Sequence, residues 1–336
     1  MTVRWEDLNA RARGLSTHLL SRAELDSFAR LPDAFSLGAA LRARGFPVEE
    51  GEGSFAALEL ASRRSAAQHL QTMARWCGPR AATLAVVFED EDRRSLRALL
   101  RGSVQAAPSE ARIAGLIPTP SLPERALETL AEQASPAAIA ALLVAWRNPY
   151  GSPLLVVASE SHPDLFKLEL LVSRTFAARA LKAARGTPAL QAYVGETIDI
   201  ENAYTALVLA GEGKDVTFKD AFLSGGQRIS ITDFEAAAAT GDAARAGRRL
   251  AEAFAGAPIA TEFTRWSGDP VQLEGAVLRV RIRALVQARR LRPLGPAPLL
   301  LYALRLRAES VDLQRVVWGI AFGAPSSTLA EELVTD

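Results

Sequence analysis

Apolar side chains recur at three- and four-residue intervals along much of the chain, which is the spacing that lines one face of a helix. One such series is Leu165, Leu168, Val172 and Phe176. Alanine, leucine and arginine, all good helix formers, are abundant throughout. The short apolar runs 84–88 and 154–158 would fit strands by themselves, but their neighbours favour helix. The pattern therefore predicts an all-α protein.

A short acidic pattern occurs three times at nearly equal intervals. The copies are Asp92-Arg-Arg-Ser95-Leu96, Asp199-Ile-Glu-Asn202-Ala203 and Glu309-Ser-Val-Asp312-Leu313. Their first acids lie 107 and 110 residues apart, and a leucine follows each acid after 24 residues. A period of about one hundred residues indicates one folding unit present in three copies.

Two further echoes support this repeat. A Leu-Glu pair is followed by an arginine five residues after the glutamate at Leu58-Glu59 and Arg64, Leu168-Glu169 and Arg174, and Leu273-Glu274 and Arg279. Residues five apart do not meet on a helix, so we expect each glutamate and arginine to contact different neighbours. The segments 24–46, 124–146 and 233–254 also correspond. Each copy should thus begin with a helical hairpin, continue with a long helix carrying Leu-Glu, and end with a helix that starts at the acidic pattern.

The three copies define the expected organisation of the chain. We place the first helical unit, with an N-terminal helix, at residues 1–112, the second at 113–220 and the third at 221–336. The stretch Glu6-Asp-Leu-Asn9-Ala10 is similar to the second acidic pattern. We therefore expect an N-terminal helix to complete the last unit and close the arrangement.

The repeated acids have two interpretations. An acid near a helix start interacts favourably with the helix dipole, and Ser95, Asn202 or Asp312 can bond backbone groups there. The alternative is an acid–base site, which would require three acids far apart in sequence to converge. We favour the first interpretation.

The segment Leu223-Ser-Gly-Gly-Gln227 matches the signature motif of ABC-type ATPases. That motif acts with an upstream glycine loop ending in Gly-Lys-Ser or Gly-Lys-Thr. Here Gly213-Lys214 is followed by Asp215. The apolar run 85–90, whose acidic end could imitate a magnesium site, precedes the motif instead of following it. We interpret the segment as a glycine turn between two helices, with a nucleotide hydrolase as the enzyme alternative.

Other reactive residues form no recognisable site. His18, His69 and His162 lack metal-ligand spacing, and Ser159-Glu-Ser-His162 lacks the Gly-x-Ser-x-Gly elbow of hydrolases. A basic run comprises Arg279, Arg281, Arg283, Arg289, Arg290 and Arg292. It could contact phosphates, but without interleaved aromatics it is better interpreted as a solvated helix face or a docking surface for an acidic protein.

Composition narrows the class of protein. A net charge of +1 over 336 residues provides no overall field that would attract nucleic acid. The single cysteine, Cys77, excludes an intrachain disulfide and a thiolate metal cluster. No stretch approaches the roughly 18 apolar residues of a membrane helix, and the N-terminus lacks a signal-peptide core. We expect a cytoplasmic protein, or one peripheral on the cytoplasmic side of a membrane.

In order and spacing, these motifs resemble the C subunit of V-type ATP synthases, whose eukaryotic relative is the d subunit of the vacuolar proton pump. The resemblance covers nearly the whole chain. It rests on Asn9 to Leu15, the two helices beginning at Asp92 and Asp199, the turn Leu223 to Gly226, and the helix Glu309 to Gly319. The chain departs from the family at Ser95 and Asp312, where asparagine is usual, and at Ala203, where leucine is usual.

The resemblance implies a funnel of three similar helical-bundle units in a pseudo-threefold arrangement around a central cavity. It implies a non-catalytic rotor subunit, a socket on the cytoplasmic side that couples the central stalk to the membrane rotor ring of a proton- or sodium-translocating ATPase. The partners would be the central-stalk subunits and the ring, with no nucleic acid, cofactor or membrane span. It assigns no catalytic, cofactor-binding or metal residue. The alternative is a soluble helical scaffold that binds another protein in its cavity, unrelated to the pump.

Overall fold

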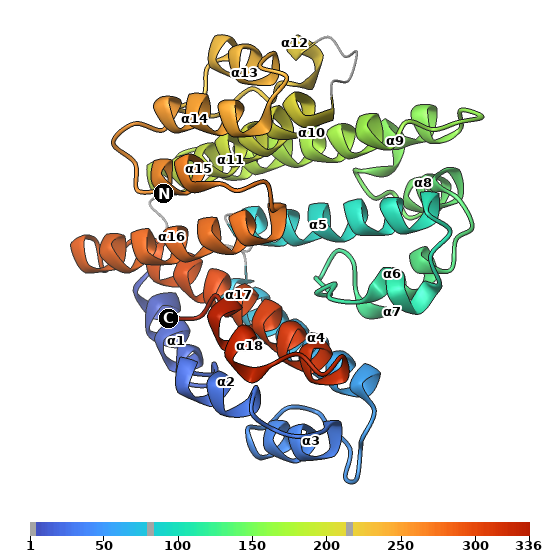
Figure 1. Ribbon diagram of the computed structural model, residues 1–336, viewed down its shortest axis with the longest axis vertical. Coiled ribbons are helices and arrows are strands. Elements are labelled where there is room, and N and C mark those ends of the chain that lie inside the picture. Colours follow the sequence, from blue (N-terminus) through green and yellow to red (C-terminus); the bar gives the residue numbers. More distant parts are fainter. Residues whose placement is uncertain (1–4, 79–83, 213–217) are drawn as a thin grey trace. The chain divides into compact units, whose positions relative to one another are not determined.

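Helices form all the regular secondary structure in the computed structural model, which describes residues 5–78, 84–212 and 218–336 (Figure 1). The all-α prediction is therefore confirmed. The apolar run 84–88 leads into α5 (Ala85–Val104), and the run 154–158 lies in α9 (Gly151–Ala158). In the same ranges, no helix combines the length and the hydropathy that a bilayer crossing requires.

Pairs of short helices open the three copies, as the corresponding segments predicted. The pairs are α2 (Arg22–Phe28) with α3 (Ala34–Ala43), α7 (Glu124–Ala131) with α8 (Pro136–Ala145), and α13 (Ile231–Ala238) with α14 (Ala243–Ala253). Side-chain caps set their starts: Ser21 with Glu24 forms a capping box on α2, and Ser230 with Asp233 forms one on α13. The second helix of each pair begins after a capping Asp33, Ser135 or Asp242.

One compact unit, unit 1, consists of residues 1–81, 109–129 and 281–336. Besides α2 and α3 it contains α1 (Glu6–Ser16), α4 (Phe55–Cys77), α6 (Ser109–Ile113), α17 (Ala297–Ala321) and α18 (Ser326–Glu332). Helix α17 is its centre, because α1, α2, α3, α4 and α18 all pack against it (Figure 1). The core includes Leu25, Leu37, Leu58, Leu313 and Val316. The N-terminal helix packs on the last long helix, which is consistent with the expectation that it completes the last unit; that it closes the arrangement stays a prediction.

The second compact unit, unit 2, consists of residues 82–108 and 130–280. Besides α5, α8, α9, α13 and α14 it contains α10 (Leu165–Ala183), α11 (Pro188–Glu212), α12 (Phe218–Ala221) and α15 (Ala260–Arg265). Helix α10 packs against α5, α9 and α11, while α13 and α14 pack on α11. Phe234, Leu250, Phe254 and Phe263 lie in the core beside α11. The boundary between the units falls within α7 and within α16 (Pro270–Leu291).

One helix contact recurs in each copy. The long helix that ends a copy packs against the short helices that begin another: α5 against α8, α11 against α13 and α14, and α17 against α2 and α3. This cyclic order is consistent with three similar units. The division at residues 112 and 220 and the pseudo-threefold arrangement around a cavity stay predictions.

The repeated acids occupy a different place from the one predicted. Asp92, Asp199 and Glu309 lie 7, 11 and 12 residues after the first residues of α5, α11 and α17. The expectation that these acids lie at helix starts and interact with the dipole is therefore wrong, since that effect is confined to the first turn. All three are almost fully buried in helix interiors, so their role is in tertiary contacts.

Candidate functional site

The second acidic pattern anchors a loop. Asp199 on α11 is fully buried, and its carboxylate accepts hydrogen bonds from the backbone N–H groups of Gln227 at 2.9 Å, Arg228 at 3.1 Å and Ile229 at 3.1 Å. Burial raises the pKa of Asp199, and the three amides oppose that shift. Gly226 fits here because a Cβ at this position would overlap the Asp199 carboxylate. The repeated acid is therefore a structural anchor.

This geometry also explains the signature-like sequence Leu223 to Gln227. The segment is a turn between α12 and α13, with Gly225 at φ +111°, which confirms the predicted glycine turn. The amide of Gln227 at its end is directed at the Asp199 carboxylate, leaving it unavailable to a phosphate. The Gly213-Lys214-Asp215 stretch, also considered for nucleotide binding, lies outside the described residues.

In two of the three copies, the polar residue three positions after the acid bonds the backbone of the segment that returns to its helix. The Asn202 side chain donates to the Leu223 carbonyl at 2.9 Å and accepts from the Leu223 N–H at 2.8 Å. The Asp312 carboxylate on α17 accepts from the N–H groups of Val334 at 2.7 Å and Thr335 at 2.8 Å. The prediction that these residues bond backbone groups is confirmed, although the backbone belongs to a segment more than 20 residues further on.

The acid of the third copy holds a different element. Glu309 accepts a hydrogen bond from the Leu20 N–H at 2.5 Å, just before α2 begins. Burial raises the pKa of Glu309 to about 7, although the Leu20 N–H and the Arg44 charge oppose the shift. In unit 1 the third acidic pattern therefore fixes both the N-terminal and the C-terminal segments to α17.

In the first copy, the acids of α5 join a buried charge cluster within unit 2. Arg93 pairs with Asp90 at 2.7 Å on its own helix and with Glu201 of α11 at 2.5 Å. Arg97 pairs with Glu201 at 2.8 Å and with Glu169 of α10 at 3.0 Å. These ion pairs tie α5 to two neighbouring helices.

The cluster continues towards both ends of α5. Arg101 also contacts Glu169, and Arg94 pairs with Glu274 of α16 at 2.6 Å. At the other end, Glu89 accepts a hydrogen bond from the Tyr150 hydroxyl at 2.9 Å and pairs with Arg179. Thus Glu89 and Asp90, which could have imitated a magnesium site, face cations and a hydroxyl group.

The electrostatics of the cluster favour its charged state. Burial would raise the pKa of Glu201, but Arg93 and Arg97 outweigh it and hold that pKa below its ordinary value. The pKa of Arg93 is raised above its ordinary value, because the charges of Glu201 and Asp90 outweigh the effect of burial. Charged acids locked to arginines cannot shuttle protons, so this arrangement suits a rigid joint between helices and not acid–base chemistry.

In the first two copies the Leu-Glu pattern behaves as predicted, because the glutamate and the arginine contact different partners. Glu59 accepts from the Gly115 N–H and the Trp318 indole, whereas Arg64 pairs with Glu124. Glu169 pairs with arginines of α5, whereas Arg174 donates to the Asp220 carbonyl. The stripe Arg93, Arg97 and Arg101 was missed, although its four-residue spacing was visible in the sequence.

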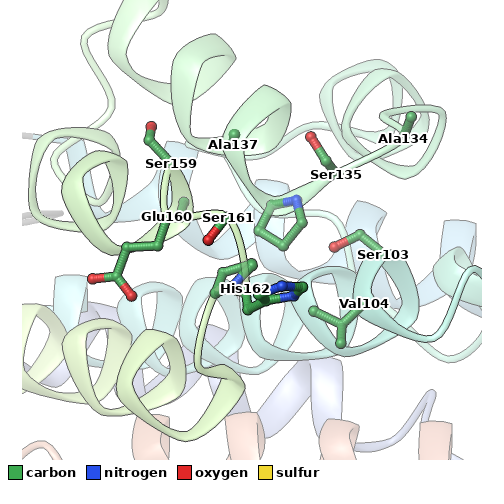
Figure 2. Close-up of a pocket in the computed structure, with 12 residues that line it drawn as sticks. Ser103, Val104, Ala134, Ser135, Ala137, Ser159, Glu160, Ser161 and His162 are labelled. Atoms are coloured by element: carbon green, nitrogen blue, oxygen red, sulfur yellow. The ribbon is translucent and has the colours of Figure 1, made fainter.

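A pocket of about 510 Å³ lies where α5 ends and α8 begins (Figure 2). Its lining includes the Ser159–His162 stretch, where the Glu160 carboxyl group points away from the His162 ring (Figure 2). Ser135 already caps α8, and Ser103 donates to the Leu100 carbonyl. All four residues of the stretch are exposed, so the pocket does not exclude water as a hydrolase site would.

The other two histidines are a packing residue and a surface residue. His69 packs on Tyr302, whose hydroxyl lies 2.6 Å from the histidine Nδ1, so it is a packing residue as predicted. His18 is exposed on the surface. In residues 5–78, 84–212 and 218–336, no three His, Cys, Asp or Glu side chains form a group that could hold a metal ion.

Comparison with known proteins agrees with the pattern of motifs. The sequence matches the ATP synthase (C/AC39) subunit family over residues 8–332. It is 31% identical over 248 residues to the C subunit of the V-type ATP synthase of Thermus thermophilus, covering 72% of this chain and 71% of that protein. The C subunit from a second strain of the same species has the same identity and coverage. The chain therefore belongs to the ATP synthase (C/AC39) subunit family, the structural and non-catalytic C subunits of V-type ATP synthases.

Proposed function

We propose that this chain is the rotor adapter of a V-type ATP synthase or ATPase. It sits on the cytoplasmic side of the membrane, receives the central stalk, and couples that stalk to the ion-carrying rotor ring. The observation that carries the proposal is the family match over residues 8–332. The chain contributes no catalytic step, because ATP chemistry and ion transport belong to other subunits.

The helix contacts support a mechanical role. A subunit that transmits torque must resist shear, and close-packed helices do so because their interiors have low compressibility. In unit 2, the ion pairs from α5 to α10, α11 and α16 add directional links that a purely apolar interface lacks. In unit 1, Asp312 and Glu309 hold both terminal segments against α17.

Each long helix contacts one or both of the short helices that begin the next copy, and this recurring contact supports a closed arrangement. Three similar units in cyclic order would surround an axis, and a stalk could enter along it. The order returns to its start, because α17 ends the third copy and packs on α2 and α3, which begin the first copy. A socket needs this kind of closed wall, whereas a single active site does not.

Native mass spectrometry tests the proposal. The full chain is mixed with the two central-stalk subunits of the same organism, and a one-to-one-to-one complex is expected. A chain that stays alone, even when detergent-solubilised rotor ring is added, would contradict the adapter role and favour a scaffold for another protein. Circular dichroism of the same sample confirms that the helices are folded, so that a missing complex is not due to unfolding.

A further inference from the structure

Two exposed leucines lie where α16 ends: Leu291 is the last residue of α16, and Leu294 lies in the turn that leads to α17. Leu291 is 81% exposed and Leu294 is 63% exposed. Scattered exposed leucines are normal on protein surfaces and need no explanation by themselves. These two differ because Arg289, Arg290 and Arg292 surround them in the sequence.

The arginines of the basic run fall into two groups. Arg281 is buried and Arg283 pairs with Asp336 at 2.9 Å. In the described part of the chain, by contrast, the guanidinium groups of Arg289, Arg290 and Arg292 form no ion pair. The second group therefore has charge available for a ligand.

A fourth arginine adds to this positive charge. Burial and the nearby charge of Arg289 lower the pKa of Arg305 on α17, with only partial compensation from Asp336. Arg305 is half-buried, so it adds its charge near that of Arg289 without being fully presented to solvent. Positive charge is therefore concentrated near this end of α16, although the whole chain carries a net charge of only +1.

The turn is also held in one conformation. The buried Asn9 amide of α1 donates to the carbonyl of Pro293 at 3.0 Å and to that of Gly295 at 2.9 Å. Pro293 and Pro296 restrict the backbone further. A preorganised turn loses little conformational entropy when it binds, so its exposed side chains are presented at low cost.

We propose that this basic turn, residues 289–294, contacts an anionic lipid surface. Arginines beside exposed leucines are the combination by which interfacial segments bind anionic bilayers. Protein interfaces combine arginine anchors with aromatic ones, and leucine is under-represented among their anchors, whereas residues 289–296 pair arginines with leucines and contain no aromatic residue. The contact is weak by itself. The inference rests on the proposed function in one respect: the rotor ring would hold this turn beside the membrane.

Vesicle co-sedimentation of the full chain tests this inference without other subunits. Phosphatidylcholine vesicles with and without phosphatidylglycerol are compared at about 0.05 M and about 0.5 M salt, which screens surface charges strongly. We expect binding only to the phosphatidylglycerol vesicles and only at low salt. Absence of binding to them would overturn the inference, and it would leave the stalk complex measured by native mass spectrometry unaffected.

Three variants identify the surface responsible. R289Q/R290Q/R292Q should lower partitioning by about a hundredfold, since each basic residue near an anionic surface contributes roughly fivefold. R245Q/R248Q/R249Q, which removes three exposed arginines from α14, is the matched control and should bind like the unmodified chain. Equal losses in both would show that overall charge causes the attraction, which would overturn the inference.

The third variant, L291S/L294S, keeps every charge of the turn. It should lose at least about tenfold in partitioning because it removes the apolar contact with the bilayer. If it binds vesicles as well as the unmodified chain, and the unmodified chain binds polyglutamate equally tightly, the turn is a dock for an acidic protein and the lipid inference is wrong.

Discussion

Asn202 and Leu223 are joined through both polar groups of the leucine backbone. The side-chain amide donates to the Leu223 carbonyl at 2.9 Å and accepts from its N–H at 2.8 Å, in a fully buried environment. Asp312 performs the related task in the third copy with two acceptor oxygens, because its partners are the N–H groups of Val334 and Thr335. Asparagine and aspartate are therefore not interchangeable at the two positions.

Asn202→Asp should destabilise the protein although it replaces only one non-hydrogen atom. The carboxylate cannot donate to the Leu223 carbonyl, and a buried unsatisfied polar group costs about 1–3 kcal/mol or more when charged. Urea unfolding followed by circular dichroism measures the free energy of unfolding. Gln191→Glu, an amide-to-acid change at an exposed position of the same helix, should have an effect below about 0.5 kcal/mol. Equal effects of the two substitutions would argue against the two-point bond.

Gly226→Ala should destabilise the loop around Asp199. The added methyl group would overlap the Asp199 carboxylate, so the three backbone hydrogen bonds to that carboxylate would lengthen or break. A loss of about 1–3 kcal/mol in the free energy of unfolding is expected from the forced shift. The control is Gly14→Ala in α1, where an added Cβ meets no other atom. That change should stabilise by about 0.5–1 kcal/mol, because glycine is a poor helix former.

The sequence contained enough information for the helices and for their repetition. Apolar spacing and the repeated Leu-Glu and acidic patterns predicted the all-α class and the helix order. The match at residues 6–10 predicted that an N-terminal helix completes the last unit, and the packing of α1 on α17 is consistent with this. The role of the acids was not predictable in the same way. Asp199 binds N–H groups 28 to 30 residues further on, and periodicity does not indicate that the chain returns there.

The buried charge cluster could not be predicted from the sequence, for a related reason. Arg93 and Arg97 lie on one face of α5, and this spacing could have been recognised. Their partners Glu169 and Glu201 come from α10 and α11, so only the packing of these helices brings the charges together. Charged residues on a helix usually indicate a solvated face, and here burial reverses that interpretation.

Arg93→Met should destabilise unit 2 more than the same substitution elsewhere on the helix. Arg93 is almost fully buried and pairs with both Asp90 and Glu201. Its removal leaves Asp90 with Arg94 and Glu201 with Arg97 as their remaining counter-ions. The expected loss is therefore about 1.5–3 kcal/mol, the range for buried hydrogen bonds to charged groups, and not the roughly 3–5 kcal/mol of a buried charge left without any partner. Arg101→Met is the matched control: Arg101 is half exposed and Glu169 keeps Arg97, so a loss below about 1 kcal/mol is expected. Similar losses from urea unfolding of both variants would show that the cluster is not a joint between helices.

Glu309 should make the stability of the protein depend on pH below neutrality. Burial raises its pKa in the folded state to about 7, from an ordinary value of 4.5. Between these values the folded chain keeps a proton that the unfolded chain releases. The stabilisation is therefore complete below about pH 4.5 and is lost as the pH rises towards 7, a change of about 3 kcal/mol.

Glu309→Gln isolates this contribution, because glutamine cannot titrate but can still accept the hydrogen bond from Leu20. The free energy of unfolding of the variant, relative to that of the unmodified chain, should rise by about 3 kcal/mol between about pH 4.5 and about pH 7.5. Glu160→Gln, at an exposed position, controls for the loss of one negative charge and should give a nearly constant difference. If the difference for Glu309→Gln is also constant over this range, then the carboxyl group of Glu309 does not hold its proton in the folded chain, and its bond to Leu20 is that of an ordinary carboxylate.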